Sequence, residues 1–297
     1  MLLATALTAA VAAATPVPLR ARIAHADLHY DAPVPRSEEG MPLGNGRMGT
    51  LVWTTPASLR FQINRNDIYP ISSASTSFFE RHNDYCGGAA FADIDLGGEV
   101  LKVPGFSQHL ALYDGTMTVA GAGVTARLLA WHAQDVIAIE IEDRRAVPAP
   151  MHVSLRMLRS ANPYFGDPYE AMIRDHKVTV KTLEHTATSQ LHVEGETIAL
   201  TQEFKEGAHF DQSAVAARVV GRTARPQIPN ETEVRLAVPA ARGRFLVLIG
   251  SGASFDAAQD VRGAVATTLQ SAALKGYAAL AEDNAGWWHA FLSLIHI

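Results

Sequence analysis

The side chains best suited to binding chemistry lie around a glycine-rich stretch near the start of the chain. Residues 41–53 read Met-Pro-Leu-Gly-Asn-Gly-Arg-Met-Gly-Thr-Leu-Val-Trp, with three glycines within six residues. Glycine permits positive φ angles and lets another surface approach the backbone closely. Asn45 and Arg47 supply the amide and guanidinium of this loop, groups that make directional hydrogen bonds. The stretch predicts either a packing corner or a binding edge, held against the apolar strand 48–53.

A second polar run follows the next expected strand. Residues 58–63 alternate polar and apolar side chains, as in a half-buried strand, and Asn-Arg-Asn-Asp comes directly after them at 64–67. Asn64, Asn66 and Asp67 are able to close turns by bonding their own backbone. They are equally suited to face a ligand, and both interpretations stay open.

The acidic residues do not form a catalytic pair. Asp93 and Asp95 are two residues apart and therefore face one side of an extended segment. Hydrolysis of a glycosidic bond needs two carboxyl groups that flank the bond, and neighbours on one strand do not. Glu140 and Glu142 alternate with isoleucines, which is typical of a solvated strand face. No catalytic residue is predicted.

Histidine and cysteine follow no metal-binding pattern in the sequence. His176, His185 and His192 stand singly, at spacings that match no zinc motif. The one cysteine, Cys86, has no partner for an intrachain disulfide. The sequence therefore predicts no metal site and no cofactor.

Composition restricts the class of partner. The chain has 297 residues, 48% hydrophobic content and a formal net charge of −5, with a pI near 6.2. This charge provides no basic field for phosphates, which argues against nucleic acid and fits a neutral polar ligand such as a sugar. No apolar run reaches the roughly 18–20 residues that a membrane-spanning helix needs.

Residues 1–26 are interpreted as a signal peptide or leader. Residues 2–14 are apolar or small and broken only by threonine, like the central region of a signal peptide, although no charged segment precedes them. The triplets Ala-Ala-Ala at 12–14 and Ala-His-Ala at 24–26 offer cleavage sites. Export predicts a secreted or periplasmic protein. A disordered alanine-rich leader is the alternative.

The next segment, residues 27–252, is predicted to form an antiparallel β-sandwich. Short extended runs recur over 106–238 at roughly 8 to 12 residue spacing, separated by Asp-Gly and Gly-Ala-Gly turns and without helices between them. The apolar run at 245–250 predicts a central strand that is buried on both faces.

Residues 253–291 are predicted to form a helical linker. Residues 254–256 are expected to cap a helix that begins near Ala258, is rich in alanine and leucine, and continues to residue 291. An apolar stripe at helical spacing predicts that one face packs against a partner. The stripe consists of Val261, Val265, Leu269, Ala272 and Ala273.

The chain resembles glycoside hydrolase family 95 and an allied family of unknown function. The resemblance lies in Pro-Leu-Gly-Asn-Gly-Arg-Met-Gly at 42–49 and Ile-Asn-Arg-Asn-Asp-Ile-Tyr at 63–69, where Arg65 replaces an acid. An insertion at 78–94 and Trp-Trp-His-Ala-Phe at 287–291 extend it over residues 27–291. The insertion makes the match closer to the uncharacterised family.

This resemblance implies a β-supersandwich of the galactose-mutarotase type, a helical linker and then an (α/α)6 barrel that holds the catalytic acid and base. The barrel would begin where this chain stops, so no catalytic position can be assigned. The residues expected to face the barrel or its substrate are Asn45, Arg47, Asn64, Asn66 and Asp67. The expected function is the non-catalytic N-terminal domain of a secreted glycoside hydrolase, whose partners are its own catalytic barrel and a carbohydrate.

A free-standing carbohydrate-binding or scaffold domain is the alternative function. It would leave the two adjacent tryptophans, Trp287 and Trp288, in an exposed apolar patch. The fragment interpretation predicts no hydrolysis by the isolated chain, and self-association through the stripe at 261–280 and the terminal aromatic residues. Residues 292–297 do not extend the family pattern and are interpreted as a non-native tail, with a genuine short strand as the alternative.

Overall fold

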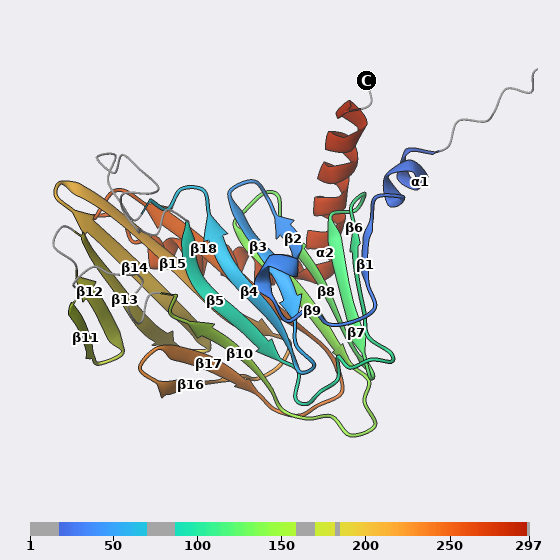
Figure 1. The fold of residues 1–297 in the computed structure, drawn as a ribbon, viewed down its shortest axis with the longest axis horizontal. Coiled ribbons are helices and arrows are strands. Elements are labelled where there is room, and N and C mark those ends of the chain that lie inside the picture. Colours follow the sequence, from blue (N-terminus) through green and yellow to red (C-terminus); the bar gives the residue numbers. More distant parts are fainter. Residues whose placement is uncertain (1–17, 70–86, 159–169, 182–184, 296–297) are drawn as a thin grey trace, which may run out of the picture.

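The computed structural model describes residues 18–69, 87–158, 170–181 and 185–295, and two antiparallel sheets dominate it (Figure 1). The larger sheet has eleven strands in the spatial order β1 (Leu28–Tyr30), β6 (Ser107–Ala111), β7 (Thr116–Gly121), β8 (Val124–Ala130), β9 (Val136–Asp143), β18 (Gly243–Ser254), β15 (His209–Val220), β14 (Thr197–Glu206), β13 (His185–Glu194), β12 (Lys177–Lys181) and β11 (Glu170–Arg174). The smaller sheet has seven, in the order β16 (Arg225–Asn230), β17 (Glu233–Val238), β10 (Met151–Arg156), β5 (Gly88–Asp95), β4 (Ser58–Arg65), β3 (Met48–Thr54) and β2 (Met41–Gly44).

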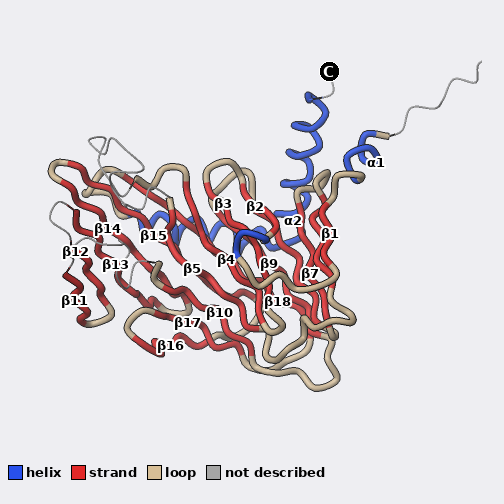
Figure 2. Tube along the Cα trace, in the orientation of Figure 1, coloured by secondary structure: helices blue, strands red, loops and turns tan. Residues whose placement is uncertain are grey.

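Helices occupy the two ends of the described chain (Figure 2). They are α1 (Leu19–Ala24), the short 3-10 helix η1 (Ser37–Glu39) and the long α2 (Val261–Ile295). The predicted mainly β, antiparallel sandwich followed by a helix is confirmed. None of the described helices is long and apolar enough to cross a membrane. Residues 292–295 continue α2, so the alternative of a short strand there is wrong.

Several sequence predictions fall outside the described residues. These are the apolar part of the leader, Cys86 with most of the insertion, and the last two residues of the tail.

The core lies between the two sheets and follows from strand alternation. In β4, Leu59, Phe61 and Ile63 are fully buried, while the residues between them are half-exposed. These side chains belong to one apolar cluster with Ile139 and Val247 of the other sheet. Alternate residues of a strand point to opposite faces, so a period of two buries one face of each sheet.

The strand β18 is buried on both faces, as its apolar sequence predicts. Phe245, Val247 and Ile249 belong to the core between the sheets, whereas Leu246 and Leu248 pack under α2. Gly250 and Gly252 lie where the helix approaches closely, because a Cβ atom would sit 3.0 Å from the Leu269 side chain at Gly250 and 2.9 Å from the Val265 side chain at Gly252.

The first part of α2 covers the outer face of the larger sheet. Val261, Val265 and Leu269 are buried there. Complete burial of an aliphatic side chain contributes about 1.5–3 kcal/mol. The partner of this stripe is therefore the chain's own sheet, and the stripe is not left exposed for the self-association expected from the sequence. The N-terminal cap of the helix differs from the predicted one at residues 254–256. The helix starts at Val261 rather than near Ala258, and the Asp260 carboxylate accepts a hydrogen bond from Gly263 N.

A kink at Gly276 divides α2 into two segments. Gly276 has φ 71° and ψ 164°, a conformation that interrupts the helix and that glycine adopts without strain. The first segment crosses behind the larger sheet, and the second turns away and projects past one edge of the sandwich (Figure 1). The loops at that edge carry most of the polar residues singled out in the sequence.

Candidate functional site

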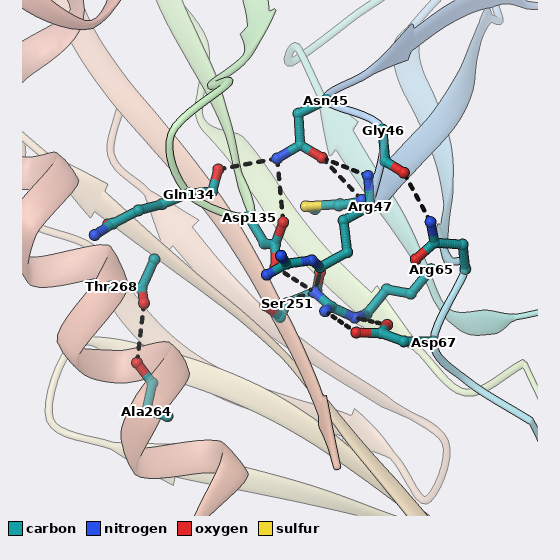
Figure 3. A network of polar contacts seen from close by, with 12 residues as sticks. Asn45, Gly46, Arg47, Arg65, Asp67, Gln134, Asp135, Ser251, Ala264 and Thr268 are labelled. Carbon is teal, nitrogen blue, oxygen red and sulfur yellow. Dashed lines mark hydrogen bonds and ion pairs between the residues drawn. The ribbon is translucent and has the colours of Figure 1, made fainter.

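The turn between β2 and β3 is held by the side chain of Asn45 (Figure 3). Its Nδ2 donates to the backbone oxygens of Trp131 at 3.0 Å and Gln134 at 3.1 Å, and to Asp135 Oδ1 at 3.1 Å. All three acceptors belong to the loop between β8 and β9. Asn45 therefore joins the edge of the smaller sheet to a loop of the larger one.

The glycines around Asn45 have different roles. Asn45 Oδ1 accepts from the backbone N–H of Arg47 at 3.1 Å and of Met48 at 2.9 Å, which closes the turn. Gly46 alone among the three glycines of the motif has a positive φ, 93°. Gly44 is needed for close strand approach, because a Cβ atom there would lie 3.0 Å from Met48 O.

Arg65 is the buried cation of this region. Its Nε and Nη2 donate to the two carboxylate oxygens of Asp67, each at 2.7 Å, while Nη1 donates to Asp135 at 2.9 Å and to Ser251 O at 3.0 Å. The side chain is only 3% exposed. Burial disfavours the charged guanidinium, yet the hydrogen bonds and charges of Asp67 and Asp135 outweigh it and raise the Arg65 pKa above its ordinary value.

Arg47 and Asn66 form the exposed rim of the same network. The Arg47 side chain is 65% exposed, with Nη1 3.5 Å from Asp135 Oδ2. Asn66 Nδ2 donates to Gly46 O at 2.8 Å, and its backbone N–H donates to Arg47 O at 3.0 Å. Both polar runs of the sequence thus meet at one place, where their outer side chains reach solvent.

Asn64 lies apart from the network. It faces the outer side of the smaller sheet, where Gln62 Nε2 donates to Asn64 Oδ1 and Asn64 Nδ2 donates to the backbone oxygen of Gln62, each at 3.1 Å. Of the five residues expected to face a partner, Asn45, Arg47, Asn66 and Asp67 are brought together and Asn64 is not. Asp67 accepts from Arg65 instead of from its own backbone, which differs from the turn interpretation. The ligand-facing interpretation stays a prediction.

The network contains residues that the sequence analysis did not select. Asp135 and Ser251 were missed because they lie 70 and 186 positions from Arg65. In the sequence, Arg65 stands where the resemblance to family 95 leads one to expect an acid. Its burial was predictable from the strand alternation, because Arg65 occupies the next inward-facing position after Leu59, Phe61 and Ile63.

The same β8–β9 loop also holds the second segment of α2. Trp131 Nε1 donates to Asp283 Oδ2 at 2.7 Å, and His132 N donates to Asn284 Oδ1 at 3.1 Å. The hydrogen bond from Trp131 lowers the pKa of Asp283. Asn284 is fully buried, so this part of the helix is docked firmly.

Beyond Asn284 the helix presents an aromatic cluster. Trp287 stacks on Phe291 with ring centroids 5.3 Å apart, and Trp288 meets both rings edge-on. Trp287 is 39% exposed, Phe291 43% and Leu294 66%. Large apolar side chains gathered on a projecting helix are typical of an interaction surface.

The acidic pair of strand β5 lies on the outer face of the smaller sheet. Asp93 and Asp95 share that face, as predicted, and line a polar groove of about 320 Å³. Arg156 Nε donates to Asp93 at 2.6 Å, and Arg60 lies 3.6 Å away. Two arginines beside one carboxylate favour a structural ion cluster over an acid–base pair.

The Asn45 network itself is a scaffold and not a reaction centre. Its two carboxylates, Asp67 and Asp135, are both bound by the Arg65 guanidinium. The oxygens of these carboxylates are thus engaged in holding the buried guanidinium. The arrangement can fix the positions of Arg47, Asn66 and the docked helix.

Comparison with solved structures places the fold. A putative kojibiose phosphorylase from the human microbiome aligns with a TM-score of 0.57 and 14% identity, over 89% of this chain and 38% of its own. A family 92 glycosyl hydrolase aligns at 0.41 and 9%, over 88% and 36%. A family 92 α-mannosidase from Bacteroides thetaiotaomicron aligns at 0.40 and 10%, over 84% and 34%. The chain thus spans well under half the length of these proteins and shares the fold of the first.

Sequence comparison gives the family. No curated protein matches the chain. Residues 29–220 match the DUF5703 N-terminal family, described as a domain of unknown function (DUF5703). The match includes the glycine loop, Arg65 and Asp135, and it covers more than half of the sequence. The chain belongs to the DUF5703 N-terminal domain family.

Proposed function

We propose that this chain is the non-catalytic N-terminal domain of a secreted carbohydrate-active enzyme that resembles glycoside hydrolase family 95. In this proposal the second segment of α2 leads toward a catalytic barrel, and the edge that carries Asn45 and Arg47 faces it. The observation that carries the proposal is the aromatic cluster of Trp287, Trp288 and Phe291. It projects beside that edge from a helix that is itself rigidly docked.

The geometry favours a non-catalytic domain that positions its neighbour over a domain that is itself catalytic. Arg65 binds both acids of the network, and in the groove of the smaller sheet Asp93 is paired with Arg60 and Arg156. A rigid edge is what such a domain would contribute, since displacement of a positioning surface by about 1 Å can lower a rate by roughly two orders of magnitude.

The carbohydrate part of the proposal rests on two supports. One is the shared fold with a putative kojibiose phosphorylase. The other is the glycine-loop motif at 42–49, which resembles the family 95 signature. Export rests on the apolar leader, and N-terminal sequencing of the protein secreted by a related host should place the mature start between residues 15 and 27.

The test compares two proteins: this chain alone, and the product of the uninterrupted gene. Both are assayed on a panel of aryl glycosides that includes a fucoside. We expect hydrolysis by the longer protein and none by the 297 residues. Cleavage by this chain alone would refute the non-catalytic role. Sugar binding by a chain that ends naturally at Ile297 would favour the free-standing binding domain.

A further inference from the structure

Three side chains with metal-ligating atoms meet at the β1 edge of the larger sheet. Asp27 directly precedes β1, His29 is its central residue, and His109 is the central residue of β6. The register of the two strands sets His29 opposite His109. One ligand atom from each of the three residues lies within 4.8 Å of the other two. The pairing of distant strands therefore creates a cluster that spacing alone does not reveal.

The cluster is partly organised before any ion binds. The two imidazole rings stack with centroids 4.1 Å apart and planes within 8°. His109 Nε2 lies 3.0 Å from Asp27 Oδ2, and Asp27 Oδ1 accepts from Leu112 N at 2.9 Å. The carboxylate is thus fixed by the backbone and turned toward the histidines.

The surroundings leave the cluster accessible from solvent. The His109 side chain is 39% exposed, while that of Asp27 is 10% exposed. His29 is exposed as well. An ion can reach the imidazoles directly, and the least exposed ligand is the one that the backbone already holds.

We propose that Asp27, His29 and His109 bind a divalent transition-metal ion of the zinc class. Two imidazoles and one carboxylate are a ligand set that Zn²⁺ accepts, with a fourth position left for water. Zinc–ligand bonds of about 2.0–2.2 Å in a tetrahedral site place ligand atoms roughly 3.3 Å apart. His109 Nε2 and Asp27 Oδ2 already lie 3.0 Å apart. The remaining adjustment, at most about 1.5 Å, therefore falls on His29, whose exposed ring must rotate out of its stack on His109.

The ion would fasten the start of the chain to the sheet. β1 has three residues and pairs only with β6 in the described sheet, so few backbone bonds hold it. A metal bridging the two strands would stabilise that pairing by mass action, because it binds the folded arrangement and not the separated strands. This role does not depend on the proposed catalytic partner.

The test is titration of the metal-stripped intact chain with Zn²⁺ at pH 7.5, followed by calorimetry. We expect one ion per chain and a rise in the melting temperature. His29→Ala and His109→Ala should each weaken binding at least tenfold, and His25→Ala, an exposed histidine outside the cluster, is the matched control. Binding should be weaker at pH 5, because protons compete for the imidazoles.

A second measurement keeps the proposal testable if those variants fail to fold. In the wild-type chain, Zn²⁺ should shift the imidazole nitrogen resonances of His29 and His109 and leave those of His25 in place. Absence of stoichiometric binding, unchanged affinity in the folded variants, or unshifted resonances at His29 and His109 would overturn the site. It would then be a hydrogen-bonded histidine stack only.

Discussion

Asn45 donates a 3.0 Å hydrogen bond to the backbone oxygen of Trp131, a residue whose indole in turn donates to Asp283. Trp131 therefore joins the glycine loop of the smaller sheet to the projecting segment of α2. Its own side chain is only 3% exposed. Through this contact, a change in the loop can reach the surface that we assign to a catalytic partner.

Asn45→Ala should destabilise the domain by about 1–3 kcal/mol, because its part-buried hydrogen bonds with Trp131 O, Asp135 and Met48 N would be lost. Urea unfolding followed by circular dichroism measures this. The control is Asn64→Ala, since Asn64 bonds only to the neighbouring Gln62 among the described contacts and should change the free energy by less than about 1 kcal/mol. Equal losses would show that the Asn45 contacts do not hold the edge.

Arg65→Met should cost about 3–5 kcal/mol, because the buried contacts of Arg65 with Asp67 and Asp135 are lost and Asp135 keeps only the longer ion pair with Arg47. Arg65→Lys should cost less but still destabilise, since lysine keeps the charge and loses the two-pronged contact with Asp67. Denaturant unfolding of both variants measures which one loses more unfolding free energy. The matched control is Arg60→Met on the outer face of the smaller sheet, where we expect less than about 1 kcal/mol. A stable Arg65→Met protein would contradict the network.

The alternation of polar and apolar residues made much of the fold predictable. Particular strands show where this pattern failed as a guide. Alternation at Leu59, Phe61 and Ile63 identified β4, and the apolar run of β18 identified a strand buried on both faces. β16 was not predicted, because two of its six residues are prolines, and it forms an edge strand in the structure. Proline is tolerated at an edge, where no ladder hydrogen bond is lost.

The site was predictable in its local part only. Asn45 and Arg47 were visible because glycines isolate them, but the acceptors of Asn45 lie about 90 residues away. The helical spacing of the apolar residues in α2 predicted a buried face. It did not predict that the larger sheet covers this face, because periodicity does not identify the packing partner. The cluster of His29 and His109 depends on β1–β6 register, which no local spacing encodes.

Asp211 should make stability depend on pH. It is fully buried, and burial raises the pKa of its carboxyl to about 6, while Tyr69 N donates to it at 2.5 Å. The folded state then binds a proton more tightly than the unfolded state, so stability present below about pH 4 is lost as pH rises through about 6. The full loss of unfolding free energy is about 3 kcal/mol.

Asp211→Asn should remove this dependence while its amide oxygen keeps the contact with Tyr69 N. The measurement is the difference in unfolding free energy between wild type and variant at pH 4.5 and 7.5. We expect the variant to gain on the wild type at the higher pH. The exposed Asp95→Asn provides the matched control. A constant difference across this range would contradict the assigned pKa.

Arg47→Ala in the product of the uninterrupted gene should lower glycosidase activity more than it lowers the melting temperature. The side chain is 65% exposed and makes only a long ion pair, so its structural contribution is at most about 1 kcal/mol. A lost contact to the catalytic domain worth 1.4 kcal/mol in the transition state reduces the rate roughly tenfold. Arg36→Ala, with the same exposed fraction, is the control. Parallel losses of activity and stability would make Arg47 structural only.

Hydrogen exchange of the amides in residues 287–294 tests the central claim most directly. The same peptide is compared in this chain alone and in the product of the uninterrupted gene, with the edge strand β16 as an internal reference. A catalytic domain that packs on Trp287, Phe291 and Leu294 should slow exchange there by at least about tenfold, since a partner must separate before the helix opens. Equal exchange of the peptide in both proteins would contradict the docking of a catalytic domain on this helix.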